Sequence, residues 1–320
     1  MSKKTIYLLG ILLTIIIGTL LNWWLCCSTC NINATNTELV AKPEIEKTPV
    51  VPVVENKVKE PTVTNPLTIK DLNGDFAFNS NENFNFNASE FSILEPISEN
   101  IQTGVDTLKT YLELNPSKTI DITGYYNNLE TNNSAFPNLG VARANAVKNY
   151  FTSKGISSKQ INTDGALKDS LAVRDSIYVG PLGFNFNIVE ETPSNSDADE
   201  IKALGDKIRD NPLVLYFNSG QSTINLTAEQ RQKIADISKY LDKVDDAFCS
   251  ITGHTDKTGR RTTNIKLAQG RADFAKDYLV QNGIPANKIK TFSEGPDSPI
   301  ASNKTKSGRA KNRRTVVTIN

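Results

Sequence analysis

Apolar and polar positions in the last third of the chain follow first a strand pattern and then a helix pattern. The apolar run LVLYF, which begins at Leu213, predicts a short strand. Thr227 then predicts the N-cap of a helix, because Ile234, Ile237 and Leu241 recur behind it at helical spacing. A strand followed by an amphipathic helix is therefore expected at the start of this region.

The pattern continues through a second strand and helix to two final strands. In the segment AFCSITG, Cys249 and Ile251 alternate inward, so Cys249 is expected to be a small buried hydrophobe and not a nucleophile. The next helix is expected over residues 263–281 and ends at Asn282 and Gly283, residue types common at helix C-termini. The segments KIKTF and RTVVTIN predict the last two strands. This order predicts an α+β fold of the βαβαβ type, with helices packed on one face of a mixed sheet.

The same pattern occurs twice in the chain. Residues 139–161 align without gaps on residues 267–289 at an offset of 128, and eight of 23 positions are identical, including Arg143 with Arg271. Upstream, the segment IDITGYYNN aligns with CSITGHTDK at an offset of 129, so the loop between the two aligned blocks contains one inserted residue. Two copies of one domain are therefore expected. They span residues 71–190 and 211–320, joined by a polar linker over residues 191–210 in which a short helix is one option.

The N-terminal segment differs from both copies because it carries no charge over 21 residues. This run, residues 5–25, matches a bilayer core of roughly 30 Å and predicts a single transmembrane helix. Lys3 and Lys4 place residues 1–4 in the cytoplasm, so the rest of the chain is expected to be exported. A cleaved signal peptide is the alternative. The length of the run and the lack of a small-x-small cleavage pattern favour the anchor.

Small residues and cysteines in and after this segment suggest that two chains pair. Gly10, Thr14 and Gly18 recur every four residues, which favours close packing against a second copy of the helix and hence a homodimer. Three cysteines follow at the exported surface, where disulfides between chains could form: Cys26, Cys27 and Cys30. The alternative is that these small residues are ordinary in a membrane helix and that the cysteines are reduced or acylated.

Residues 26–70 are expected to form a spacer, because prolines every few residues deny a sheet its hydrogen-bond donors.

Charge composition and the inventory of reactive residues exclude several functions. The chain has 36 Lys and Arg against 35 Asp and Glu, so no long-range field for nucleic acid follows. The single histidine, His254, excludes a histidine-based metal cluster or a catalytic triad, and no pair of nucleophile and base is visible. Neither an enzymatic activity nor a cofactor or metal is therefore expected. A basic cluster near the C-terminus lacks aromatic stacking partners and is interpreted as a solvated helix face with structural ion pairs: Lys304, Lys306, Arg309, Lys311, Arg313 and Arg314.

One arginine lies on the apolar face of the second predicted helix. At 100° per residue, Arg271 falls in an apolar stripe and is expected to need an anion; the other members of the stripe are Leu267, Phe274 and Tyr278. Asp256, in the loop before this helix, is the candidate. The pair has two interpretations, an internal salt bridge and a ligand-binding site.

The second copy resembles the OmpA-like C-terminal domain family over about residues 213–320. The resemblance is carried by three segments in order: ITGHTDKTG, NIKLAQGRADFAKDYLVQNGI and SNKTKSGRAKNRRT. The resemblance implies non-covalent binding of peptidoglycan through the diaminopimelate residue of the stem peptide. It implies that Asp256 and Arg271 grip that residue and that four further residues line the site: Thr255, Thr258, Asn264 and Leu267. The free end of diaminopimelate carries an ammonium, which suits Asp256, and a carboxylate, which suits Arg271.

The first copy departs from this family pattern in its loop and at its end. Tyr125 and Tyr126 replace the histidine and threonine, Asn127 replaces the aspartate, and the terminal NRR is absent. Arg143 nevertheless remains, so the arginine is expected to persist without an acid. We therefore expect a degenerate OmpA-like domain that folds similarly and binds peptidoglycan poorly. Its role as a spacer, a dimerisation surface or a docking module stays open.

The anchor and the binding domain lead to one functional hypothesis, a non-catalytic protein of the bacterial cell envelope that tethers a membrane to peptidoglycan. Both domains are expected in the periplasm, and the inner membrane is favoured over the outer. The alternative is a stator-like or envelope-machine component whose first domain docks a protein partner. An ion-driven stator needs a carboxylate within its membrane helix, and residues 5–25 contain none.

Overall fold

The computed structural model describes residues 64–188, 196–216 and 224–320. The expected transmembrane helix at residues 5–25, the three neighbouring cysteines and most of the expected spacer lie outside these residues. Within the part of the chain that is described, no helix is both long enough and apolar enough to cross a membrane.

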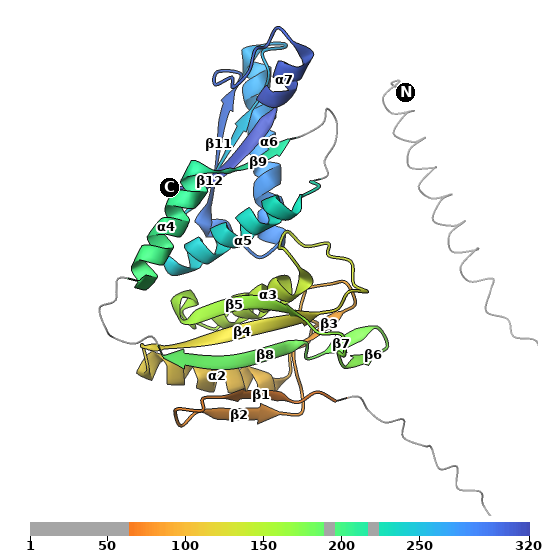
Figure 1. The fold of residues 1–320 in the computed structure, drawn as a ribbon, viewed down its shortest axis with the longest axis vertical. Coiled ribbons are helices and arrows are strands. Elements are labelled where there is room, and N and C mark those ends of the chain that lie inside the picture. Colours follow the sequence, from red (N-terminus) through yellow and green to blue (C-terminus); the bar gives the residue numbers. More distant parts are fainter. Residues whose placement is uncertain (1–63, 189–195, 217–223) are drawn as a thin grey trace, which may run out of the picture. The chain divides into compact units, whose positions relative to one another are not determined.

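The second repeat forms one four-stranded mixed sheet with helices packed against it. Its elements in chain order are β9 (Leu213–Tyr216), α5 (Ala228–Lys243), β10 (Cys249–His254), α6 (Arg261–Gln281), β11 (Ile289–Gly295), α7 (Lys306–Asn312) and β12 (Arg314–Ile319). The strand order is β11-β10-β12-β9, and Figure 1 shows α5 and α6 beside this sheet. β10 and β11 are parallel and the other pairs are antiparallel. The parallel pair requires a crossover, which α6 supplies, and the predicted α+β architecture is confirmed.

Two local predictions for this repeat are also confirmed. Thr227 caps α5, accepting the N–H of Gln230, while the Gln230 side chain accepts the N–H of Thr227. Cys249 is fully buried in the core of the sheet, and this burial raises the pKa of its thiol to about 12. A thiol with such a pKa is almost never a thiolate at neutral pH, as expected for a structural cysteine.

The buried face of α6 differs from the predicted stripe. The residues that α6 buries are Asn264, Ala268, Ala272, Ala275 and Leu279, whereas Leu267 is 48% exposed. Only small side chains fit on this face of α6, because the helix lies very close to the sheet. A Cβ added to Gly253 of β10 would lie 2.0 Å from the carbonyl oxygen of Ala268. The stripe that contains Arg271 therefore lies at the border of the interface and not at its centre.

The first repeat repeats this plan around a three-stranded sheet. Its main elements are α2 (Glu99–Leu114), β4 (Lys118–Tyr126), α3 (Leu139–Ser153), β5 (Ile161–Leu167) and β8 (Leu182–Ile188). The sheet order is β5-β4-β8, with β4 parallel to β5 and antiparallel to β8 (Figure 1). Gly124 of β4 stands 129 positions before Gly253 and has the same close approach, because an added Cβ would lie 2.0 Å from the carbonyl oxygen of Gly140.

The first repeat carries additional strands that the sequence pattern did not predict. A hairpin pairs β1 (Leu67–Lys70) with β2 (Ala77–Ser80), and a second small sheet has the order β3-β7-β6: β3 (Asn85–Asn87), β7 (Ile177–Val179) and β6 (Val173–Arg174). β1 lies inside the expected spacer. Leu67 and Ile69 are buried on one side of this strand. Pro66 stands just before the strand, where the missing N–H of proline removes no hydrogen bond between strands.

The segment between the repeats is mostly helical. α4 (Ser196–Asp210) occupies most of the expected linker at residues 191–210. Ile208 is buried in the core of the second repeat, and Leu204 packs beside it. Leu204 and Ile208 stand four residues apart, which places them on one face of the helix. A helix that packs against the second repeat therefore occupies much of the expected linker, in which a short helix was one option.

Both repeats belong to one compact unit. Lys148 of α3 is 1% exposed, and its Nζ lies 2.6 Å from a carboxylate oxygen of Asp242 on α5. The side-chain oxygen of Asn282, at the end of α6, accepts the N–H of Ala135 at 2.6 Å. Phe136, from the loop before α3, is part of the core cluster of the second repeat. The repeats thus share buried polar and apolar contacts.

Candidate functional site

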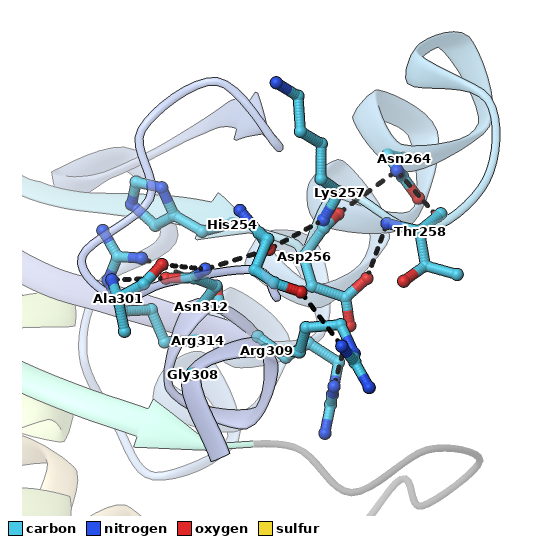
Figure 2. Close-up of polar contacts among 12 residues, drawn as sticks. His254, Asp256, Lys257, Thr258, Asn264, Ala301, Gly308, Arg309, Asn312 and Arg314 are labelled. Atoms are coloured by element: carbon cyan, nitrogen blue, oxygen red, sulfur yellow. Dashed lines mark hydrogen bonds and ion pairs between the residues drawn. The ribbon is translucent and has the colours of Figure 1, made fainter. Parts of the chain in front are cut away.

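The loop between β10 and α6 carries the predicted ligand-binding acid and is held by hydrogen bonds at its centre. The N–H of Thr258 donates to Oδ1 of Asp256 at 2.9 Å. From the first turn of α6, the buried Asn264 donates through Nδ2 to the carbonyl oxygens of Asp256 at 3.3 Å and Thr258 at 3.0 Å (Figure 2). Asn264 therefore positions the loop through its backbone.

The beginning of the loop is attached to two other segments. The N–H of Thr255 donates to the carbonyl oxygen of Gly295 at 2.7 Å, and the N–H of Lys257 donates to Oδ1 of Asn303 at 3.1 Å. Thr255 is buried, and its hydroxyl has no hydrogen-bond partner among the described residues. Burial, and to a lesser extent the positive charge of Arg314, lower the pKa of the neighbouring His254, which makes this imidazole neutral at pH 7.

Asp256 pairs with Arg313, so the internal salt bridge from Asp256 to Arg271, one of the two interpretations of the sequence, is not formed. Nη1 of Arg313 donates to Oδ2 of Asp256 at 2.7 Å, and the two side chains are 27% and 13% exposed. Burial alone would raise the pKa of Asp256, but the hydrogen bonds from Arg313 and Thr258 outweigh it, so the pKa lies below its ordinary value. The carboxylate is therefore ionised at neutral pH and keeps its negative charge in a partly buried position.

Arg271 has no carboxylate within ion-pair distance among the described residues. Its Nη1 donates to the carbonyl oxygen of His254 at a long 3.4 Å. Burial lowers the pKa of Arg271, the positive charge of Arg313 lowers it further, and Asp256 acts in the opposite direction. Asp256, Arg271 and Arg313 are thus within electrostatic reach of one another, and Arg271 retains guanidinium donors that no carboxylate uses.

Two residues of the NRR segment contribute to this site, although the sequence analysis placed Arg313 in a basic surface and gave Asn312 no contact of its own. Oδ1 of Asn312 accepts the N–H groups of Ile300 and Ala301, and its Nδ2 donates to Asn303, which in turn holds Lys257 (Figure 2). Arg313, the next residue, is the partner of Asp256. The segment NRR was visible as a family signature, but the pattern did not indicate which side chain its arginines contact.

The side chains of the two remaining predicted residues, Leu267 and Thr258, lie at the border of the site. Leu267 stands one helical turn before Arg271 and offers an apolar surface, since it is 48% exposed. The side chain of Thr258 lies on the exposed part of the loop. In the part of the chain that the structure describes, no group of three His, Cys, Asp or Glu side chains could hold a metal ion. The arrangement offers an anion, a cation and an apolar edge, which together suit a zwitterionic organic group.

The equivalent arginine of the first repeat does have an acidic partner, contrary to expectation. Arg143 forms an ion pair with Glu130, in which Nη2 lies 2.5 Å from Oε1. Sequence comparison missed this partner because it looked for an acid at the position of Asp256, which Asn127 occupies, whereas Glu130 stands three residues further along.

The sequence model of the OmpA family matches residues 84–176 and 216–313, which together make up more than half of the chain. The peptidoglycan-binding protein ArfA of Mycobacterium tuberculosis is 35% identical over 128 residues, which cover 40% of this chain and 38% of ArfA. The outer membrane protein Omp38 of Acinetobacter baumannii is 31% identical over 180 residues, 56% of this chain and 46% of Omp38. The chain therefore spans less than half of the length of these two curated relatives.

Another relative and two solved structures each match less than half of the chain. The peptidoglycan-associated lipoprotein of Brucella melitensis is 30% identical over 129 residues, 40% of this chain and 71% of that protein. The crystal structure of the peptidoglycan-associated lipoprotein of Burkholderia pseudomallei matches at 24% identity, covering 33% of this chain and 89% of that one, with a TM-score of 0.29. The C-terminal domain of Helicobacter pylori MotB matches at 27% identity, covering 34% and 84%, also with a TM-score of 0.29.

Proposed function

The chain belongs to the OmpA family, and from this premise we propose that its second repeat binds peptidoglycan non-covalently at Asp256 and Arg271. The ligand group is the diaminopimelate residue of a stem peptide. One observation carries the proposal: an ionised carboxylate, Asp256, lies within electrostatic reach of Arg271, an arginine without a carboxylate partner among the described residues. The proposed role is binding and not catalysis.

The chemistry of the ligand matches this pair of charges. The free end of diaminopimelate carries an ammonium and a carboxylate on one carbon, so its complement is an acid and a guanidinium side by side. Asp256 takes the ammonium and shares its charge with Arg313, whose single hydrogen bond uses Oδ2. Arg271 takes the carboxylate with the donors that its long bond to His254 leaves unused. Leu267 and Thr258 border the ligand, and Asn264 and the buried Thr255 hold the loop in position.

The relatives support this choice of ligand. ArfA carries the description of a peptidoglycan-binding protein, and the Brucella relative is a peptidoglycan-associated lipoprotein. In this chain, the aspartate, the arginine and the NRR segment occur together in the second repeat. The same copy is therefore the one to which we assign the wall contact.

The test compares the full chain with its Asp256→Asn variant in co-sedimentation with peptidoglycan that contains diaminopimelate. Asparagine keeps the shape and the turn but removes the anion. Because a hydrogen bond to a charged group contributes about 1.5–3 kcal/mol, the apparent affinity should fall roughly 10- to 150-fold. Asp236→Asn is the matched control, since Asp236 is also 13% exposed and paired with a cation, Lys207, outside the loop. If Asp256→Asn folds normally and sediments as well as the control, Asp256 is not part of the binding site.

Membrane attachment forms the second half of the proposed function. The 21 uncharged residues at positions 5–25, preceded by Lys3 and Lys4, support an anchor that keeps both repeats in the periplasm of a bacterial envelope. A protein attached to a membrane at one end and to peptidoglycan at the other is a tether. The first repeat then lies between the anchor and the wall-binding repeat along the chain.

A further inference from the structure

Arg143 of the first repeat is held in a closed, carboxylate-filled site. Its Nη1 and Nη2 donate to Oε2 and Oε1 of Glu130 at 3.1 and 2.5 Å, a bidentate arrangement. The two side chains are 0% and 2% exposed. The guanidinium also lies over two aromatic rings, 5.0 Å from the ring centre of Tyr178 on β7 and 5.5 Å from that of Phe86 on β3. The small sheet β3-β7-β6 of the first repeat therefore covers the guanidinium of Arg143.

The two repeats place this arginine in the same way. Nη1 of Arg143 donates to the carbonyl oxygen of Tyr125 at 3.0 Å, and Nη1 of Arg271 donates to that of His254, the aligned residue, at 3.4 Å. Each guanidinium is therefore fixed against the end of the corresponding strand, β4 or β10. The side chains and loops around the two guanidinium groups can therefore be compared position by position.

The loops that face the two arginines also begin alike. Oδ1 of Asn127 accepts the N–H of Leu129 at 2.9 Å, as Oδ1 of Asp256 accepts the N–H of Thr258 at 2.9 Å. One residue beyond this shared turn the repeats diverge. The first repeat has Glu130, and the second has a glycine at the aligned position, with no side chain to reach its arginine.

The surroundings of Glu130 are those of a bound carboxylate. Besides the two donors of Arg143, the N–H of Asn127 donates to Oε2 at 3.1 Å and the N–H of Ser89 donates to Oε1 at 3.1 Å. Four donors therefore converge on two carboxylate oxygens. The side chain of Asn127 is itself engaged, since its Nδ2 donates to the hydroxyl of Tyr178 at 2.7 Å. The donors of Arg143 that face Glu130 and the side-chain amide of Asn127 are therefore already in use.

We propose that Glu130 is a resident carboxylate that occupies the arginine site of the first repeat, so that this repeat takes up no external carboxylate ligand at Arg143. The closure, and not only the change from aspartate to Asn127, makes the first repeat unresponsive to the ligand class of its neighbour. The proposal concerns the occupancy of Arg143 and does not depend on what the second repeat binds.

The test removes the resident group and offers an external one. In the full chain with Glu130→Ala, the side-chain carboxylate is gone while the donors of Arg143, Asn127 and Ser89 remain. Sodium acetate should then raise the Tm of the variant in a saturable way, by roughly 3–6 °C at ten times the dissociation constant, beyond the effect of sodium chloride at equal concentration. Wild type provides the baseline, because it contains the same Arg271. Glu200→Ala is the matched control, since it removes an acid from an exposed ion pair with Lys239.

Three outcomes bear on the proposal. A saturable acetate response of Glu130→Ala that disappears on adding Arg143→Leu supports it. A response no larger than that of wild type and Glu200→Ala overturns it, as does a response that persists without Arg143. If Glu130→Ala does not fold in chloride, refolding yield is the measurement: yield that rises with acetate supports the proposal, and equal yield in both salts refutes it.

Discussion

The two equivalent arginines should lose very different amounts of stability on the same substitution, methionine, which keeps an unbranched apolar stem but removes the guanidinium. Arg143→Met leaves Glu130, at 2% exposure, as an unpaired buried carboxylate. Breaking a buried ion pair from one side costs about 3–5 kcal/mol of unfolding free energy. Arg271→Met removes a half-buried guanidinium that makes one hydrogen bond of 3.4 Å and has no described carboxylate partner. Because its charge is already disfavoured by burial, this loss should stay within about 1 kcal/mol.

Urea unfolding of the full chain, followed by far-ultraviolet circular dichroism, measures this contrast. With a slope of about 2 kcal/mol/M, the midpoint of Arg143→Met should fall by roughly 1.5–2.5 M, and that of Arg271→Met by at most about 0.5 M. Co-sedimentation with peptidoglycan should show the reverse order, with binding lost in Arg271→Met and kept in Arg143→Met under native conditions. Similar destabilisation by both substitutions, or a larger loss from Arg271→Met, would show that the two arginines do not differ in occupancy as argued.

Two further predictions concern pH and the membrane. Because Arg313 helps to hold the pKa of Asp256 below its ordinary value, Arg313→Gln leaves burial to raise that pKa. Peptidoglycan binding should therefore be lost at a higher pH in Arg313→Gln than in wild type when co-sedimentation is followed downward from about pH 7; coinciding acid midpoints would contradict this role of Arg313. For the anchor, wild type should stay with membranes during alkaline carbonate extraction, whereas a chain without residues 1–25 should be released, and release of both would remove the case for a transmembrane segment.

Much of the fold was predictable because its signals are local. The cap at Thr227 and the inward side chain of Cys249 follow from periodicity over a few residues, and the internal alignment shows that the first repeat should share the plan. The buried face of α6 was mispredicted because large apolar residues were taken as the core-facing ones. At this interface the close approach of Gly253 to Ala268 admits only small side chains, so alanine marks the buried face and Leu267 is exposed.

The site was less predictable because its decisive contacts join distant segments. The resemblance selected Asp256 and Arg271, yet nothing in the spacing indicates that Asp256 pairs with a residue 57 positions away, Arg313. Glu130 lies 13 positions before Arg143, in a loop with one inserted residue relative to the second repeat. The pairing of Glu130 with Arg143 depends on the conformation of that loop. The two aromatic rings over Arg143, those of Phe86 and Tyr178, come from strands with no counterpart in the aligned pattern.

The buried pair of Arg143 and Glu130 also constrains how the first repeat can evolve. Once both members are enclosed, losing either one alone leaves a buried charge without its counterion and lowers the stability of the whole compact unit. An open site at this position would require the loss of Glu130 and the displacement of Phe86 and Tyr178, and the loss of Glu130 alone leaves Arg143 as a buried charge without its counterion. Single substitutions at either position are therefore disfavoured, and the residues at positions 130 and 143 are expected to change together.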